Sequence, residues 1–238
     1  MKVVLFCGGL GTRLREYSET IPKPMVDIGP RPIIWHLMRY YAHFGHRDFV
    51  LCLGYRGNVI KDYFLNYNEC LSNDFTLRKG GKEVELVGRD IEDWIIRFAD
   101  TGIQSNIGQR LHAIRHLVEH EEMFLANYAD GLSDLPLEPY IDDFRRSNAV
   151  AAFVAVRPSL SLSGVTFEDN GTVTAITYLN DSDVWINGGF FVLRPEVFDF
   201  IRPGEELVEA PFRRLIEARR LKAYRYEGFW SAMDTFKD

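Results

Sequence analysis

The chain has 238 residues, 46% hydrophobic and 26% charged, an ordinary composition for one globular domain spanning residues 1–238. With a net charge of −6 and no run of more than two Lys or Arg residues, it is not expected to bind nucleic acid or an anionic membrane. The N-terminal apolar run stops at Gly8 and no other stretch is long enough to span a bilayer, so we expect a cytoplasmic location.

In chain order, runs typical of strands alternate with helical patterns. The strands are expected at Val3–Cys7, Phe49–Leu53, Met123–Asn127 and Ala149–Val156. The helices are expected at Ile33–Phe44, Val59–Asn66, Gly108–Glu119 and Leu137–Ser147. This alternation is typical of βαβ units and predicts an α/β fold, a doubly wound, mixed but mainly parallel sheet covered on both faces.

The second half of the chain has a different sequence pattern, with short alternating segments in place of long apolar runs. The segment "GVTFEDNGTVTAITYL" alternates and turns at Asp169-Asn170-Gly171, a strong signal for a hairpin with a two-residue turn. A strand "INGGFFVLR", a helix at Pro211–Arg220 and a strand at Lys222–Tyr226 follow. A small β-rich flap is therefore expected to decorate the sheet.

The cysteines and one histidine series favour structural over chemical roles. Cys7 and Cys52 lie inside apolar runs and are interpreted as buried thiols in a reducing compartment; with Cys70 they make an odd number without metal-ligand spacing. Three histidines four residues apart could chelate Zn²⁺ from one helix face. These histidines, at positions 112, 116 and 120, lie on the side of the expected helix opposite its apolar residues. This placement favours a solvent-exposed helix face over a metal site: His112, His116 and His120.

The segment "FCGGLGTRLREYSETIPKPM" has the outline of a phosphate cradle. Glycines at 8, 9 and 11 allow backbone N–H groups to wrap an anion, and Arg13 and Lys23 flank the same loop. Pro22 and Pro24 hold Lys23 extended. The spacing matches neither the dinucleotide-binding fingerprint nor the P-loop, so a plain surface turn remains the alternative.

Three further segments carry candidate ligand groups. Asp130 follows a strand at the edge where open α/β sheets bind ligands, and it offers a hard oxygen to Mg²⁺; an ordinary turn is the alternative. Asn187-Gly188-Gly189 would allow a close backbone approach or form a bulge. Asp100-Thr101-Gly102 could line a pocket or simply precede a helix.

The motif G-G-x-G-T-R followed by P-K-P-M resembles the signature of the sugar-phosphate nucleotidyltransferases. The segments "ADTG", "INGGFFVLRPEVFDFI" and "GFWSAMDT" resemble in particular the glucose-1-phosphate cytidylyltransferases, over nearly the whole chain. The resemblance implies a Rossmann-like sheet, Mg²⁺, and the formation of CDP-glucose and pyrophosphate from CTP and glucose 1-phosphate. It also implies a homo-oligomer, as in many members of the family.

The resemblance assigns residues to roles. Arg13 and Lys23 would be catalytic, holding phosphates around the attacked phosphorus. Asp130 and Asp234 would hold the metal. The nucleotide would be bound by Gly8, Gly9, Gly11, Thr12, Arg13, Thr101, Ser105, Gly108 and Arg110. The acceptor would be bound by Tyr128, Tyr178, Asn187 and Gly188.

Two positions depart from the family pattern. Ala129 stands where relatives have glycine, and Thr177-Tyr178-Leu179 stands where they have Glu-Lys-Pro, whose lysine binds the acceptor phosphate. Losing that contact costs about 1.5–3 kcal/mol. Either Arg157 or Arg194 substitutes, or the acceptor is another sugar phosphate, a cyclitol phosphate or a phosphonate. A nucleotide-binding regulatory module without turnover is the alternative from a different functional class.

Overall fold

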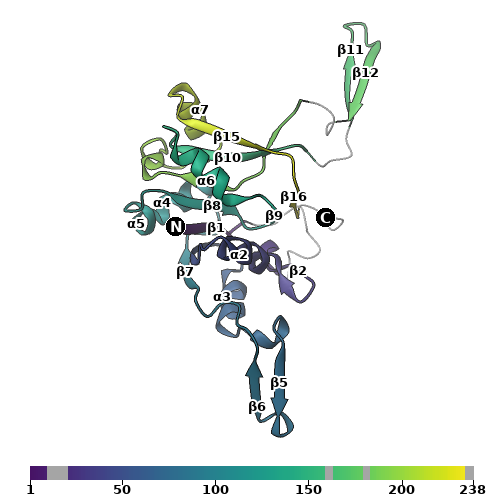
Figure 1. Cartoon of the computed structure of the whole chain (residues 1–238). Coiled ribbons are helices and arrows are strands. Elements are labelled where there is room, and N and C mark those ends of the chain that lie inside the picture. The colour runs from purple at the N-terminus through teal and green to yellow at the C-terminus, as the bar shows by residue number, and fades with distance from the viewer. Residues whose placement is uncertain (10–20, 159–162, 179–182, 234–238) are drawn as a thin grey trace.

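One large mixed sheet forms the centre of the protein (Figure 1). The computed structural model describes residues 1–9, 21–158, 163–178 and 183–233. The sheet has eight strands: β7 (Ile95–Asp100), β4 (Asp48–Leu53), β1 (Lys2–Phe6), β8 (Phe124–Tyr128), β14 (Phe191–Leu193), β10 (Ala151–Val156), β13 (Ile186–Asn187) and β15 (Leu221–Tyr226). β15 pairs along the whole of β10, whereas β14 and β13 pair with successive parts of it.

The strand directions confirm the predicted doubly wound, mixed α/β sheet. β7, β4, β1 and β8 run parallel to one another, and β10 runs parallel to β15. β14 is antiparallel to both β8 and β10, between which it lies. The carboxyl ends of β1, β4, β7 and β8 therefore meet at one edge of the sheet, where ligands of open α/β sheets bind.

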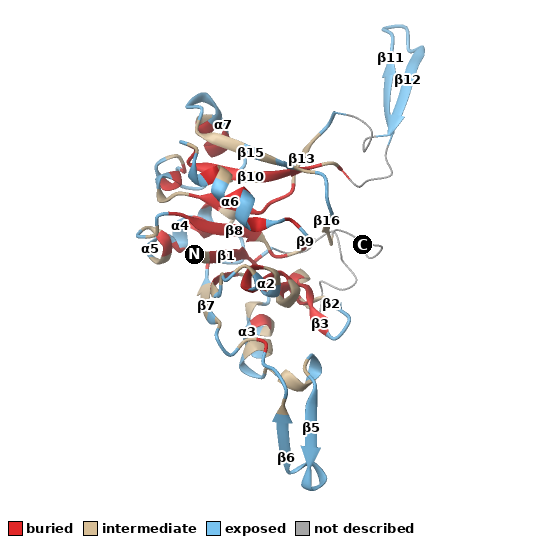
Figure 2. Cartoon of the chain, viewed as in Figure 1, coloured by how far each residue is buried: buried red, intermediate tan, exposed pale blue. Residues whose placement is uncertain are grey.

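Two apolar layers sandwich the sheet, because successive strand residues point to opposite faces. On one face, Leu5 packs in a cluster with α2 (Ile33–His43), α3 (Gly57–Leu65) and α6 (Leu137–Arg145). On the other face, Val4 packs in a cluster with α4 (Ile107–Ala113), α5 (Arg115–Val118) and α7 (Ala210–Glu217). Figure 2 shows the buried residues gathered along the sheet and the facing sides of these helices.

Two hairpins extend from opposite ends of the sheet region (Figure 1). β11 (Ser163–Phe167) and β12 (Val173–Tyr178) form the predicted flap, and every residue of both strands is exposed. Its turn uses three residues rather than two, because Gly171 N–H bonds to the Glu168 carbonyl and Glu168 N–H to that of Thr172. The second hairpin, β5 (Phe75–Arg78) and β6 (Glu83–Leu86), was not predicted.

Short elements complete the described chain. Two small strand pairs are β2 (Asp27–Ile28) with β3 (Arg31–Pro32), and β9 (Gly131–Ser133) with β16 (Trp230–Ala232). Short 3-10 helices lie at Lys23–Met25, Glu69–Leu71, Lys79–Gly81 and Pro195–Asp199. None of the described helices is long and apolar enough to cross a membrane.

Two predicted elements are each divided in the structure. The helix expected at Gly108–Glu119 breaks at Ile114 into α4 and α5. The strand expected in "INGGFFVLR" breaks into β13 and β14, because Gly189 and Phe190 have left-handed φ values of 76° and 49°. The predicted face of the histidine series is confirmed, since its members are exposed and the opposite residues are buried: His112, His116 and His120 against Leu111, Ile114 and Val118.

The cysteines are expected to differ sharply in reactivity. Cys7 and Cys52 are buried, as predicted, and Cys70 is half-buried. Burial raises the pKa of the Cys52 thiol to about 12 and also raises the pKa of the Cys7 thiol, so both stay protonated at pH 8, whereas the thiolate is the reactive form. Iodoacetamide should therefore label only Cys70 in native protein and all three cysteines in denaturant, as read by intact mass. Rapid native labelling of Cys7 or Cys52 would contradict this prediction.

Candidate active site

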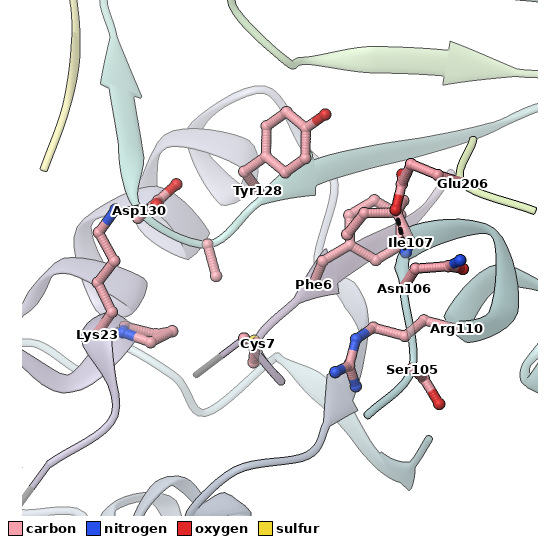
Figure 3. A pocket seen from close by; sticks show the side chains of 13 residues that line it. Phe6, Cys7, Lys23, Ser105, Asn106, Ile107, Arg110, Tyr128, Asp130 and Glu206 are labelled. Atoms are coloured by element: carbon pink, nitrogen blue, oxygen red, sulfur yellow. Dashed lines mark hydrogen bonds and ion pairs between the residues drawn. The ribbon is translucent and has the colours of Figure 1, made fainter. Parts of the chain in front are cut away.

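A cavity of about 360 Å³ opens at the carboxyl ends of β1 and β8. Figure 3 shows its side chains, with Lys23 and Asp130 on one side and the group from Ser105 to Arg110, with Glu206, on the other. The lining residues are Phe6, Cys7, Gly9, Lys23, Pro24, Ser105, Asn106, Ile107, Arg110, Tyr128, Ala129, Asp130 and Glu206. Four predicted site residues lie outside the described part of the chain: Gly11, Thr12, Arg13 and Asp234.

The cavity brings together Lys23 and Asp130, which are remote in sequence. Lys23 Nζ lies 2.5 Å from Asp130 Oδ2, and their side chains are 13% and 25% exposed. Lys23 is the first residue of a 3-10 helix whose next two residues are buried, and Pro22 before it is extended. The backbone therefore fixes the position from which the Lys23 side chain projects. The result is a partly desolvated cation and carboxylate facing the same space (Figure 3).

The surroundings of Asp130 fit a magnesium ligand. Its carboxylate is a hard oxygen donor at a strand end, and Mg²⁺ typically takes only one or two protein carboxylates. Met233 donates its backbone N–H to the Asp130 carbonyl at 2.9 Å, and Ala232 pairs with Gly131 in the β16–β9 ladder. Among the described residues there is no group of three or more metal-ligating side chains. The second predicted ligand, Asp234, directly follows Met233 in sequence.

Arg110 lines the cavity, but its guanidinium donates hydrogen bonds to four groups of the protein itself. Nη2 donates to the Gly8 carbonyl at 2.9 Å, and Nη1 donates to the Leu53 carbonyl, Thr101 Oγ1 and the Gly102 carbonyl at 3.1, 2.7 and 3.0 Å. Burial lowers the pKa of this guanidinium. Arg110 thus ties together the segments that follow β1, β4 and β7, and it builds the pocket wall by holding them in place.

Two predicted nucleotide-binding glycines are explained by packing. A Cβ on Gly8 would lie 2.0 Å from Arg110 Nη1, and a Cβ on Gly108 would lie 2.2 Å from the Glu205 carbonyl oxygen. Neither glycine lines the cavity, whereas the exposed Gly9 does. Thr101 also lies outside the lining, because its buried hydroxyl donates to the Leu53 carbonyl at 2.8 Å.

The opposite wall contains residues that sequence reasoning missed. Asn106 caps α4 in a reciprocal pair with Gln109, each side chain accepting from the other residue's N–H at 2.9 Å. Glu206 Oε2 accepts from Ile107 N–H at 3.1 Å, which joins the loop before α7 to this helix start. Ser105, which was predicted, lines the cavity beside them. The Asn-x-x-Gln capping pattern could have drawn attention to Asn106; Glu206 has no comparable local signal.

Two acceptor candidates lie at or beside the cavity. Tyr128 lines it, and burial, reinforced by the charge of Glu206, raises the pKa of its phenol to about 12. A hydrogen-bonding interaction with the Asn187 side chain acts against this rise in the pKa of Tyr128. Ala129, one of the two departures from the family pattern, is buried in the lining, so its methyl group narrows this part of the cavity.

Other acceptor candidates are not brought to the cavity. Gly188 is buried, and a Cβ there would meet Trp230 Nε1 and the Val154 carbonyl at 3.1 Å, so close packing explains this glycine. Tyr178 is 60% exposed on the projecting β11–β12 hairpin. Arg194 donates to the Ser147 and Ala149 carbonyls at 3.2 and 2.6 Å and is therefore engaged elsewhere.

Comparisons with known proteins agree with this arrangement. The Nucleotidyl transferase family matches residues 2–235. The glucose-1-phosphate cytidylyltransferase of Salmonella typhi is 38% identical over 240 residues, which cover 100% of this chain and 93% of the relative. Two solved structures share the fold: UDP-glucose pyrophosphorylase complexed with UDP-glucose (TM-score 0.71, 18% identity, 99% and 94% coverage) and HddC from Yersinia pseudotuberculosis (TM-score 0.68, 19% identity, 99% and 95% coverage). The chain therefore belongs to the nucleotidyl transferase family, close to the glucose-1-phosphate cytidylyltransferases.

Proposed function

We propose that the protein transfers CMP from CTP to glucose 1-phosphate. An oxygen of the acceptor phosphate attacks the α-phosphorus of CTP, the bond from that phosphorus to the bridging oxygen breaks, and pyrophosphate leaves. The products are CDP-glucose and pyrophosphate. The observation that carries this proposal is the 38% identity to a glucose-1-phosphate cytidylyltransferase over the whole chain, which favours glucose 1-phosphate over other acceptors and over a non-catalytic module.

The residues of the cavity suit this reaction. Negative charge builds up on the attacked and leaving groups, and a preorganised cation lowers its free energy. Lys23 would supply that cation at the α-phosphate, and Arg13 would bind the other phosphates of CTP. Asp130 and Asp234 would hold Mg²⁺, which when bound neutralises charge on the nucleotide phosphates. Ser105, Asn106 and Glu206 would line the nucleotide side.

Pyrophosphate release tests the proposal directly. Purified protein with Mg²⁺ is assayed with each of CTP, GTP, UTP, ATP and dTTP, crossed with glucose 1-phosphate, mannose 1-phosphate and galactose 1-phosphate. We expect kcat/KM for CTP with glucose 1-phosphate to exceed every other combination by at least about tenfold, which corresponds to about 1.4 kcal/mol. EDTA should abolish the release. A higher kcat/KM for another pair would contradict the assignment.

A further inference from the structure

A second cavity, outside the site described above, gathers two cations around an aromatic ring. It is lined by Arg157, Asp183, Trp185, Arg225 and Glu227. The Cζ atoms of Arg157 and Arg225 lie 4.5 and 5.5 Å from the centroid of the Trp185 ring. Arg157 Nη1 is 3.9 Å from Asp183 Oδ1, a carboxylate that is fully exposed. The cavity therefore has an indole wall and several convergent hydrogen-bonding groups.

These side chains project from the α4 face of the sheet, to which part of the lining of the first cavity also belongs. Val156, Ile186 and Tyr226 pack into the apolar cluster on the α2 face. Because side chains alternate along a strand, the residues next to these three point to the opposite face, on which Phe6 and Tyr128 of the first cavity also pack. Asn187 and Arg225 are such neighbours within strands, and the residues that directly adjoin the strand ends line the same cavity as Arg225: Arg157, Trp185 and Glu227.

Asn187 lies between Tyr128 of the first cavity and Trp185 of the second, although it lines neither. It pairs with Ala155, which pairs with Arg225 on the next strand, so the three form a row across the sheet. Trp185 is two residues from Asn187 along the same direction, about 6.7 Å further out on the same face. On its other side, Asn187 is close enough to Tyr128 to affect its pKa. A hexose extending from a phosphate at Lys23 and Asp130 past Asn187 would point toward Trp185 and the two arginines.

The charges of the second cavity favour a neutral polar group over another phosphate. Its two arginines are balanced by Asp183 and Glu227, so the lining carries no net charge. An aromatic face with flanking donors and acceptors suits the C–H face and the hydroxyls of a sugar. We infer that Trp185, Arg157 and Arg225 bind the hexose of the acceptor at the end away from its phosphate. This inference rests on the proposed function.

The first test replaces Trp185. In Trp185→Ala, the KM for glucose 1-phosphate should rise about tenfold, the loss expected for one aromatic contact, while the KM for CTP changes less than about twofold. Phe167→Ala is the matched control, because Phe167 is 69% exposed on the flap hairpin. A purely structural stack of Trp185 with the arginines would lower the Tm without a selective change in the acceptor KM, and that result would overturn the inference.

The second test pairs a variant with modified acceptors. Arg225→Gln should lower kcat/KM for glucose 1-phosphate about tenfold, and lower it less for whichever of 4-deoxy- and 6-deoxyglucose 1-phosphate lacks the contacted hydroxyl. An equal loss with all three acceptors would overturn the inference. If wild-type protein turns over only another acceptor, the proposed function fails by itself, and the KM of Trp185→Ala for that acceptor still decides the role of Trp185.

Discussion

Replacing Lys23 with alanine is expected to lower kcat by about 10²–10³-fold, the effect of removing one preorganised charge from a phosphoryl-transfer site. The side chain is largely buried, 2.5 Å from Asp130, and faces the cavity. Asp130 can take up water once the lysine is gone, so the protein should lose no more than roughly 1–2 kcal/mol of unfolding free energy. Pyrophosphate release and urea unfolding, measured on the same preparation, separate the two effects.

Two further lysine variants sharpen this test. Lys61→Ala removes an exposed lysine from α3 and should leave kcat unchanged. Lys23→Arg keeps the charge but not the compact ammonium, so its kcat should lie between those of wild type and Lys23→Ala. A kcat for Lys23→Ala within about threefold of wild type would remove Lys23 from the proposed chemistry.

Replacing Arg110 with methionine is expected to act on stability first, by about 3–5 kcal/mol of unfolding free energy. Its guanidinium is buried and donates to four acceptors, and without it the carbonyls of Gly8 and Leu53 lose charged donors. Both carbonyls keep neutral donors, the N–H groups of Tyr55 and Thr101, so the loss is that of hydrogen bonds from a charged donor, about 1.5–3 kcal/mol each. Unfolding in urea, with the midpoint and slope both recorded, measures the loss.

Arg115→Met provides the matched control for Arg110. Arg115 follows closely in sequence, but its side chain is 46% exposed and pairs with Glu119, so its loss should cost less than about 1 kcal/mol. If Arg110→Met unfolded like wild type and instead weakened CTP binding, the original sequence prediction of a nucleotide-binding arginine would be restored.

The fold was predictable wherever local pattern and burial agree. β1, β4, β8 and β10 coincide closely with apolar runs because both of their faces are buried, and such strands read as continuous hydrophobic segments. The β5–β6 hairpin escaped prediction because each of its strands has only four residues and almost all of them are exposed, so no buried run marks it. The division of β13 from β14 depends on the left-handed Phe190, whose N–H bonds to the Asn127 side chain 63 residues away.

Residues of the candidate site could be predicted from the sequence only where the residue type and its local motif indicate a chemical role. Lys23 and Asp130 were each proposed from their local motifs, and the fold brings them together. Gly8 and Arg110 were assigned to a ligand, yet they contact each other across 102 positions of sequence, a pairing that no local pattern contains. Loop packing brings Glu206 to the first cavity, and strand register brings Trp185 to the second. Both depend on the complete fold, so no local sequence pattern predicts them.

The antiparallel strand β14 determines how the two halves of the sheet depend on each other. The parallel strands β7, β4, β1 and β8 form one half of the sheet, β10 and β15 belong to the other, and β14 hydrogen-bonds to both β8 and β10. A polypeptide that stops before Phe191 contains β8 and β10 without the strand that joins them. Each would then present an open edge on which another chain can add a strand. The three residues of β14 thus join the two halves into one continuous sheet and cover an edge of each.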